Sequence, residues 1–268
     1  MVLPQGVLNM SDKPKIAVHK FSSCDGCQLA FLNLGETLLE LPKLVEIVHF
    51  AEAGPMDEDQ PVDVSLVEGS INTAHDLERI QRIRKNSGYL ISIGACATSG
   101  GLQALRNMAD AKAWASAIYA SPEHLDSLDT ATAIADHVKV DLALWGCPVN
   151  SRQVLGALRD LLFGVAPREE RRPLCMECKR MGKVCTLVTQ KAACMGPVTK
   201  AGCGALCPSV GRACYACYGP SELVNDSSLG RCFEGFGLLP EDVARRFHFI
   251  SNGAPVFRQA GERFRGGA

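Results

Sequence analysis

Short runs of apolar, β-branched residues recur through the first part of the chain, separated by segments whose apolar positions recur at helical spacing. Such a run predicts a β-strand, and regular alternation with amphipathic segments predicts the strand–helix–strand units of a parallel sheet. The predicted strands are Lys15–Lys20, Val45–Phe50, Val62–Val67, Tyr89–Ile93 and Val140–Trp145.

Two of the intervening segments have clear helix signals. Thr73 is a predicted N-cap, with Asp76 three residues later, apolar residues following at helical spacing and Gly88 near the end. A second helix is predicted from Ser151, and its apolar face consists of Val154, Leu155, Leu158, Leu161 and Leu162. The Ala-rich stretch Ala109–Asp136 is also predicted to be helical.

Five strands with such crossovers predict an α/β fold with a flavodoxin-like parallel sheet in the order 2-1-3-4-5. We assign this domain to residues 1–165. The pattern changes after Val165, where residues 167–173 form a plausible linker. Residues 166–268 are then predicted to form an irregular cysteine-rich domain, with almost no periodicity before about Pro240. Such a segment needs metal to stabilise it.

The charge balance excludes several classes of partner. The chain has 268 residues, 47% of them hydrophobic, and 28 Lys and Arg against 29 Asp and Glu. This balance indicates no nucleic-acid partner and no basic membrane patch. No apolar run reaches the roughly 18 residues of a membrane span. Residues 1–12 lack the pattern of an export signal, so we expect a cytoplasmic protein.

The cysteine content is the most unusual feature of the composition. Of thirteen cysteines, four are scattered over the first 150 residues and nine lie between Cys175 and Cys232. In a reducing cytosol disulfides are not expected, and the odd number also argues against a closed disulfide framework. Soft thiolates at this density indicate zinc or iron–sulfur clusters.

The first set of cysteines consists of Cys24, Cys27, Cys96 and Cys147. Each follows a predicted strand directly, so the fold should bring all four to the carboxyl edge of the sheet, where ligands bind. Nearby glycines would let the backbone approach a cluster there. Glu68 ends the third strand at the same edge and is a candidate for orienting groups or relaying protons.

Other interpretations of this set remain. Cys24 and Cys27 alone have the spacing of a thioredoxin-like redox pair, which leaves Cys96 and Cys147 unexplained. A single buried cysteine at a strand end is often only a small hydrophobic residue. A flavin is not expected, because the CxxC motif occupies the place of a flavodoxin phosphate loop.

Eight further thiols divide into two sets of four in the cysteine-rich segment. Two zinc ribbons are the main alternative, but zinc favours paired CxxC knuckles. Only Cys175/Cys178 and Cys214/Cys217 are such pairs, and the others stand singly among Gly and Pro, which favours iron–sulfur clusters. The single cysteines are Cys185, Cys194, Cys203 and Cys207.

From Lys15 to about Pro220 the chain resembles the small subunits of [NiFe]-hydrogenases. The most specific matching segments are Cys24-Asp25-Gly26-Cys27, Val67-Glu68-Gly69, Gly94-Ala95-Cys96, Gly146-Cys147-Pro148, and the stretch from Cys194 to Cys203 that reads CMGPVTKAGC. The resemblance implies three [4Fe-4S] clusters that transfer electrons, while the H2-activating nickel–iron site belongs to a separate large subunit.

The resemblance also assigns each set of cysteines to one cluster. The first set would bind the proximal cluster, Cys175, Cys178, Cys185 and Cys194 the distal cluster, and Cys203, Cys207, Cys214 and Cys217 the medial cluster. Membrane-associated members usually have a histidine where this chain has Cys175, and often a proline where it has Cys207. Cys232 matches no ligand and is expected to be a free thiol.

These two departures, together with the expected absence of an export signal, make the chain similar to cytoplasmic sulfhydrogenase-type enzymes. Such enzymes pair the hydrogenase dimer with flavin- and iron–sulfur-containing subunits that use NAD(P). Alternatives are a hydrogenase linked to a heterodisulfide reductase or a deazaflavin, the quinone-linked subunit of a respiratory complex, and a zinc-binding scaffold. The respiratory subunit would have adjacent cysteines near the first strand and a single cluster, which are absent here.

Overall fold

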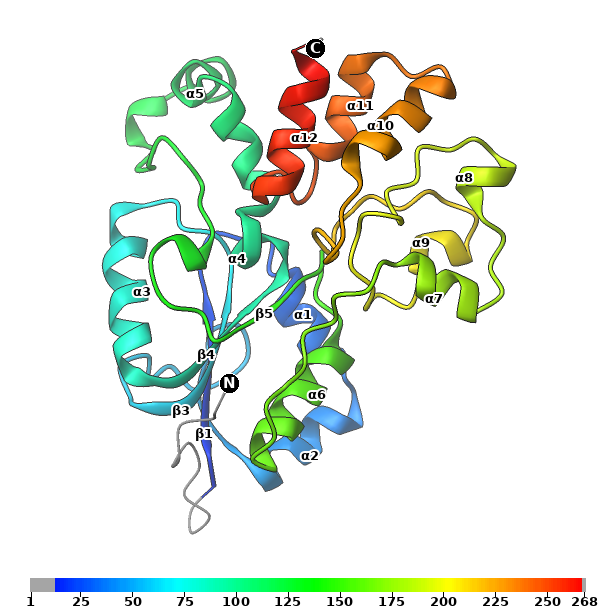
Figure 1. The fold of residues 1–268 in the computed structure, drawn as a ribbon. Helices are drawn as coiled ribbons and strands as arrows, with labels where there is room; N and C mark the ends of the chain where they lie inside the picture. The colour runs from blue at the N-terminus through cyan, green and yellow to red at the C-terminus, as the bar shows by residue number, and fades with distance from the viewer. Residues whose placement is uncertain (1–12, 267–268) are drawn as a thin grey trace. The chain divides into compact units, whose positions relative to one another are not determined.

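The computed structural model describes residues 13–266, so the expectation about residues 1–12 lies outside the described residues. The chain forms two compact units (Figure 1). The first contains the described residues up to Leu144 together with Pro148–Glu169. The second contains Trp145–Cys147 and continues from Glu170.

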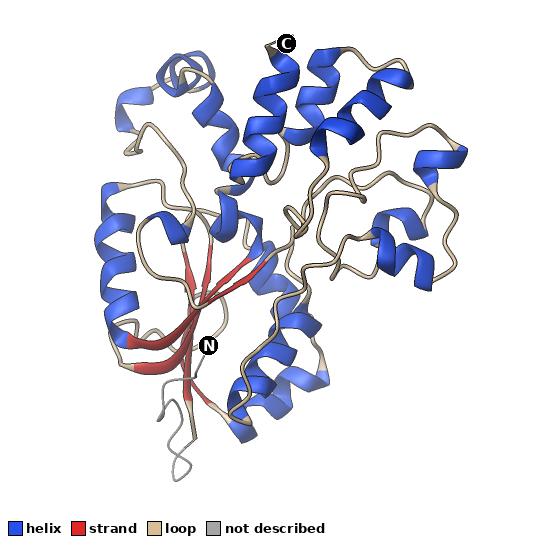
Figure 2. Ribbon diagram, in the orientation of Figure 1, coloured by secondary structure: helices blue, strands red, loops and turns tan. Residues whose placement is uncertain are grey.

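The first unit is built on a parallel sheet of five strands, seen in red in Figure 2. The observed strand order is β2-β1-β3-β4-β5, which confirms the predicted topology and the α/β fold class. The strands are β1 (Lys15–Lys20), β2 (Glu46–Phe50), β3 (Val62–Glu68), β4 (Ser87–Ile93) and β5 (Leu142–Leu144).

Helices cover both faces of this sheet. α1 (Gly26–Leu32), α2 (Glu36–Leu44) and α6 (Ser151–Leu162) pack on one face, where their apolar residues share a core with strand residues such as Leu66 and Ile91. α3 (Ala74–Asn86) and the short α4 (Gly94–Ser99) contribute to the core on the other face. Coverage on both faces explains why the strands read as continuous apolar runs.

The predicted helix signals have the expected effect. The Thr73 side chain accepts a hydrogen bond from the Asp76 N–H, and Asp76 in turn accepts from the Thr73 N–H, which completes a capping box at the start of α3. α6 begins at Ser151, and its buried residues include Val154, Leu158 and Leu161.

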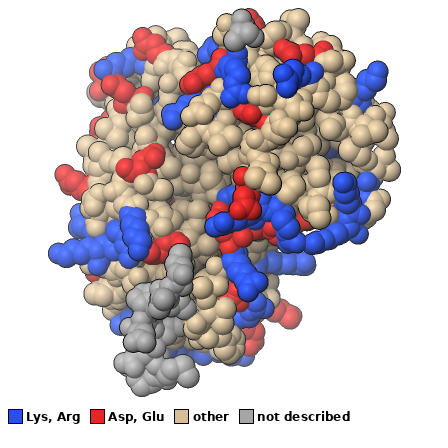
Figure 3. Space-filling model, viewed as in Figure 1, with Lys and Arg blue, Asp and Glu red and all other residues tan. Residues whose placement is uncertain are grey.

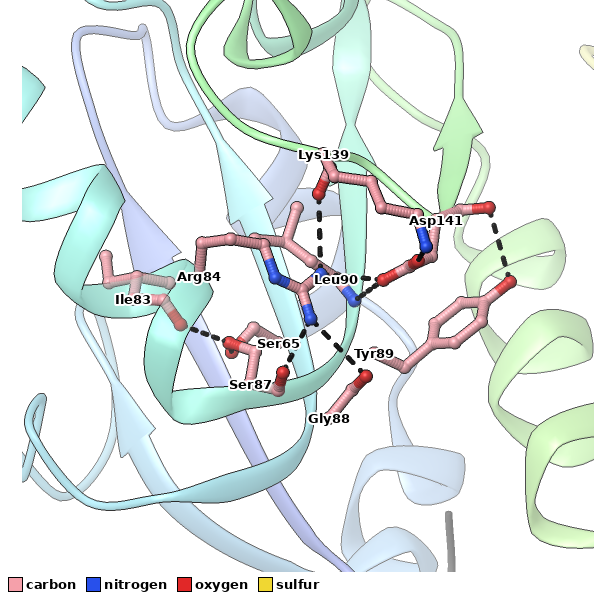
Figure 4. A network of polar contacts seen from close by, with 9 residues as sticks. All are labelled: Ser65, Ile83, Arg84, Ser87, Gly88, Tyr89, Leu90, Lys139 and Asp141. Atoms are coloured by element: carbon pink, nitrogen blue, oxygen red, sulfur yellow. Dashed lines mark hydrogen bonds and ion pairs between the residues drawn. The ribbon is translucent and has the colours of Figure 1, made fainter. Parts of the chain in front are cut away.

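A polar network fixes the end of α3 to β4 and β5 (Figure 4). Arg84 donates to the Asp141 carboxylate at 2.7 Å and to the Ser87 carbonyl at 2.6 Å. The same Asp141 oxygen accepts from the Leu90 N–H at 2.9 Å. Burial of Asp141 would raise its pKa, but the Leu90 and Arg84 hydrogen bonds outweigh burial and the pKa of Asp141 is lowered.

The stretch from Ala109 to Asp136 is less helical than predicted. It follows the 3-10 helix η1 (Gly101–Met108) and contains one α-helix, α5 (Ala111–Ile118). Only two 3-10 turns come after α5 in this stretch, η2 (Pro122–His124) and η3 (Ile134–Asp136). High Ala content favours a helix but does not supply a buried face, and α5 has no buried residue.

The second unit consists of cysteine-bearing loops followed by three helices (Figure 2). The loops contain the short helices α7 (Cys175–Arg180), α8 (Thr186–Thr189) and α9 (Leu206–Ser209). After them come α10 (Asp226–Gly235), α11 (Pro240–Phe247) and α12 (Pro255–Arg265). Phe233, Phe247 and Phe257 from these last helices pack in one core with Met195 and Cys214 of the loops.

The sequence predicted an irregular segment before about Pro240 that only metal would stabilise. Instead, α10 is a regular helix in that segment, and its apolar residues pack into this core. Ordinary apolar packing therefore contributes to this unit. No helix among residues 13–266 combines the length and apolar character needed to cross a bilayer.

Candidate functional site

Cys24 and Cys27 lie at the start of α1, directly after β1. Between them Asp25 has φ 63°, a left-handed conformation that is uncommon for a residue other than glycine. The Cys24 thiol is exposed, and the Cys27 sulfur accepts a weak hydrogen bond from the Val149 N–H at 3.5 Å. The left-handed turn thus shapes a CxxC loop at the carboxyl end of β1.

Glu68 holds this loop from the end of β3. Its carboxylate accepts from the Ser23 hydroxyl at 2.6 Å and from the Gln28 N–H at 2.8 Å, on either side of the two cysteines. The side chain is 1% exposed, and burial raises the pKa of Glu68 against the opposing effect of these two hydrogen bonds. These two hydrogen bonds tie the end of β3 to both sides of the CxxC loop.

Cys96 lies in α4, at the carboxyl end of β4. Its thiol donates to the Gln103 side-chain oxygen at 3.2 Å, and the Gln103 amide donates to the Ser22 carbonyl at 3.1 Å. Gln103 therefore connects the loop after β1 to the loop after β4. No sequence signal points to Gln103, because a single glutamine after the Gly100–Gly101 pair forms no pattern of its own.

Cys147 belongs to the second unit together with Trp145 and Gly146. There its backbone N–H donates to the Cys217 sulfur. Burial raises the pKa of Cys217 to about 12, and the neighbouring thiols of Cys203, Cys147 and Cys207 add to the shift. Within the first unit, Cys24, Cys27 and Cys96 all follow the carboxyl ends of β1 and β4.

One small cavity in the second unit is lined by an entire predicted set of cysteines. Its volume is about 80 Å³, and its walls include Cys175, Cys178, Cys185 and Cys194. Gly196 also lines the cavity, and a Cβ there would lie 3.5 Å from the Cys194 sulfur and 3.6 Å from that of Cys175. Burial, then Cys194 and the other thiols, raises the pKa of Cys175 to about 11.

The remaining set is also close together. Burial raises the pKa of Cys203, Cys214 and Cys217. Neighbouring thiols of the set add smaller effects, from Cys207 on Cys203, from Cys217 on Cys214, and from Cys203 and Cys207 on Cys217. The Cys214 N–H also donates to the Cys194 sulfur at 3.2 Å, so Cys214 lies next to the cavity that Cys175, Cys178, Cys185 and Cys194 line.

A second carboxylate positions these loops. Glu177, inside the Cys175–Cys178 pair, accepts from the Gly202 N–H at 2.9 Å and from the Ala205 N–H at 3.1 Å. Its two oxygens thereby bracket Cys203, much as Glu68 brackets the CxxC loop. Glu177 has no local signal in the sequence, because its two backbone donors come from residues 25 and 28 positions away.

The donor set fits an iron–sulfur cluster. Groups of thiols share a cavity or a loop, and four sulfurs are the ligands that iron–sulfur clusters or zinc select. Ala205 at φ 50° and Ala216 at φ 60° lie in left-handed conformations inside the Cys203–Cys207 and Cys214–Cys217 loops. Strained backbone of this kind concentrates at functional sites. Cys232 is half-buried on α10.

Residues 24–161 match the family described as NADH ubiquinone oxidoreductase, 20 kDa subunit. The chain is 36% identical to the sulfhydrogenase 2 subunit delta of Pyrococcus furiosus over 87% of this chain and 97% of the relative. It is 30% identical to a subunit of the F420-non-reducing hydrogenase vhu of Methanocaldococcus jannaschii over 92% of this chain and 98% of the relative.

Two solved structures extend the comparison. A chain of an NAD+-reducing [NiFe]-hydrogenase in the H2-reduced state has a TM-score of 0.54 and 27% identity, and the match covers 59% of this chain and 96% of that chain. A chain of the actinobacterial-type NiFe-hydrogenase from Ralstonia eutropha H16 has a TM-score of 0.57 at 17% identity, covering 95% of this chain and 90% of that chain. The second likeness concerns the fold alone.

Proposed function

Because the chain belongs to the NADH ubiquinone oxidoreductase 20 kDa subunit family, as a [NiFe]-hydrogenase small subunit of the sulfhydrogenase type, we propose that it relays electrons from the nickel–iron site to a separate reductase. It is a subunit of an oxidoreductase that acts on H2, and its relatives are hydrogenase subunits that pair with a large subunit. The hydrogen-activating site lies in that large subunit.

The family name alone would equally describe a respiratory quinone-linked subunit. Two features favour the hydrogenase assignment: the near-full-length relatives are named as hydrogenase subunits, and the chain has two further sets of four cysteines after residue 161.

The proposal includes three [4Fe-4S] clusters. We assign the proximal cluster to Cys24, Cys27, Cys96 and Cys147, the distal cluster to Cys175, Cys178, Cys185 and Cys194, and the medial cluster to Cys203, Cys207, Cys214 and Cys217. The observation that supports this most directly is the cavity whose walls contain the whole distal set. When bound, such clusters supply one-electron transfer.

The protein residues have definite tasks in this arrangement. The cysteine thiols must lose their protons to become ligands, and the raised pKa values of Cys175 and Cys217 mean that a cation has to drive this loss. Glu68 and Glu177 hold the backbone beside the ligands in one geometry, since each accepts two hydrogen bonds from the loop that it supports. The Cys214 and Cys147 N–H groups donate to ligand sulfurs, which stabilises their thiolate form.

For the electron acceptor, we propose a flavin- and iron–sulfur-containing pair of subunits that uses NAD(P), in the cytoplasm. The relative named as a sulfhydrogenase delta subunit and the likeness to an NAD+-reducing enzyme support this acceptor. The NAD+-reducing chain leaves about two-fifths of this chain unmatched, whereas the Methanocaldococcus jannaschii relative matches 92% of it. That coverage keeps a second candidate open: an acceptor other than NAD(P), such as a heterodisulfide reductase.

The test uses the complex of this chain with its large subunit, purified without oxygen. About twelve iron and twelve sulfide per small subunit are expected beyond the iron of the large subunit, as three four-iron clusters require. Two or three zinc ions without sulfide would instead establish the zinc scaffold.

A second measurement addresses the acceptor. Under H2, the complete enzyme should reduce NADP+ or NAD+ when its reductase subunits are present. H2-dependent reduction of a heterodisulfide or a deazaflavin, with no reaction of either nicotinamide, would replace the proposed acceptor with one of the alternatives.

A further inference from the structure

Two buried histidines lie side by side on the sheet of the first unit. His19 is on β1 and His49 on β2, neighbouring parallel strands in which Ala17 is paired with His49. Their rings stack with centroids 4.9 Å apart, and each residue is 2% exposed. Strand pairing fixes both backbones, so the two imidazoles are held in place before any ligand arrives.

The third member of this cluster is Glu58, from the loop between β2 and β3. Its Oε1 lies 3.8 Å from Nδ1 of His19, which is too long for a hydrogen bond. One ligand atom from each of His19, His49 and Glu58 lies within 4.8 Å of the other two. Arg79 of α3 donates to the same Oε1 of Glu58.

The hydrogen bonding of the histidines is incomplete. Both ring nitrogens of His49 and the Nδ1 of His19 are buried and have no hydrogen-bond partner among residues 13–266. A neutral imidazole has one donor and one acceptor nitrogen, and burying either without a partner is unfavourable. These nitrogens are therefore placed to bind a ligand from outside the described chain, and the electron relay proposed above does not use them.

We propose that His19, His49 and Glu58 bind one divalent transition-metal ion of the zinc class. Two imidazoles and one carboxylate are a common donor set for zinc, with a fourth position left to water. Glu58 is 27% exposed, which gives that water a path to the ion. Bound there, the ion ties the loop between β2 and β3 to the first two strands of the sheet.

The protonation states agree with this site. Burial lowers the pKa of His19, and burial followed by repulsion from His19 lowers the pKa of His49, so both rings are neutral at pH 7. The His19 ring, 3.8 Å away, and then the Arg79 guanidinium lower the pKa of Glu58, so the carboxylate is ionised. Neutral imidazole and ionised carboxylate are the forms that bind metal.

The geometry requires only a small adjustment. In a tetrahedral zinc site with bonds of about 2.0–2.1 Å, neighbouring ligand atoms lie about 3.3–3.4 Å apart. The ligand atoms of His19, His49 and Glu58 lie within 4.8 Å of one another, so binding requires them to move slightly closer. Glu58, in a loop, can supply this movement. Arg79 is the one cation on Glu58 among the described residues, and a carboxylate has enough lone pairs to accept from Arg79 and bind an ion together.

The test again uses the cluster-replete hydrogenase complex, in which the cysteine sites are filled with iron. The complex is dialysed against micromolar zinc and then against buffer, and zinc is counted per small subunit. Zinc K-edge absorption should show nitrogen and oxygen at about 2.0–2.1 Å with imidazole scattering, and no sulfur at about 2.3 Å. This measurement needs no variant, so it decides even where a substitution prevents folding.

Variants add residue specificity. His49→Gln should lose the single zinc ion, while His75→Gln, which changes an exposed histidine on α3, should retain it. Iron content should stay the same in both, so the outcome is independent of the proposed clusters. Wild-type complex that retains no zinc, a sulfur shell around the zinc, or full retention by His49→Gln would each overturn the proposal.

Discussion

Carboxylates at a few positions hold together loops that are far apart in sequence. Glu68 and Glu177 accept backbone N–H groups beside cysteines, and Asp141 accepts from the Leu90 N–H and from Arg84. A carboxylate can accept several hydrogen bonds at once, and bonds to a charged group are stronger than those between neutral groups. Single acidic residues therefore fix loop geometry that the loops' own sequences do not specify.

The first prediction concerns the single substitution Asp141→Asn. The amide keeps the shape but loses the charge that Arg84 and Leu90 stabilise, so the free energy of unfolding at pH 7 should fall by about 2 kcal/mol. The folded-state pKa of Asp141 is lowered, so its contribution is present above the unfolded value of about 3.9 and is lost as pH falls through the folded value.

Thermal unfolding of wild type and variant should consequently differ most at neutral pH and converge in acid. Asp129→Asn is the matched control, because its carboxylate is 77% exposed and pairs only loosely with Lys112 at 3.5 Å. An equal melting temperature of Asp141→Asn and wild type at pH 7 would contradict the role given to this network.

Glycines in the turns at the strand ends allow the backbone to lie close to the predicted ligand loops. Gly101 has φ 61°, and a Cβ there would meet the Cys96 sulfur at 2.7 Å and the Cys96 Cα at 2.9 Å. Gly69, at φ 92°, lies equally close to the Phe21 backbone at the end of β1. Close backbone approach next to the predicted ligands is thus built into these turns by glycine.

The second prediction is that Gly101→Ala weakens the proximal site. The new methyl group would displace the Cys96 thiol and strain a left-handed residue, with a cost of about 1–2 kcal/mol from the backbone alone. Iron content should fall, with the loss confined to the proximal cluster in the electron paramagnetic resonance spectrum. Gly156→Ala is the control, since no atom lies within 4 Å of a Cβ there, and in α6 it should stabilise by up to about 1 kcal/mol.

Two features concern the whole molecule: the balance of surface charge and the division of the predicted ligands between two compact units. Basic and acidic side chains are interspersed over the face seen in Figure 3, in keeping with the net charge of −1. The first unit contributes Cys24, Cys27 and Cys96, and the second contributes the other nine predicted ligands. A working relay therefore depends on both units being folded in one complex with the large subunit.

The third prediction tests this dependence with Cys24→Ala. Loss of one proximal ligand should reduce H2-driven dye reduction to background and lower iron by up to about four atoms. The large subunit should still co-purify in equal amount. Cys232→Ala, outside the three sets, should keep both iron and activity. Normal dye reduction by the Cys24 variant would show that this cysteine does not hold the proximal cluster.

Much of the first unit follows from the sequence, and the reason is local. The apolar runs, the Thr73 capping box and the helix from Ser151 are signals contained within a few residues, and each led to the observed element. The sheet order followed because parallel crossovers allow few topologies. The segment after Ala109 was less predictable, because its Ala-rich composition lacks the buried face that would stabilise a long helix.

The sequence by itself determined the parallel sheet and the family, and it marked twelve thiols as candidate ligands, because these depend on short-range periodicity and on motif spacing. Only the tertiary structure decided which groups assist them. Gln103 and Glu177 act on partners from distant loops, and His19 meets His49 only because β1 and β2 are neighbours. Contacts of this kind arise when the chain folds back on itself, so no local pattern encodes them.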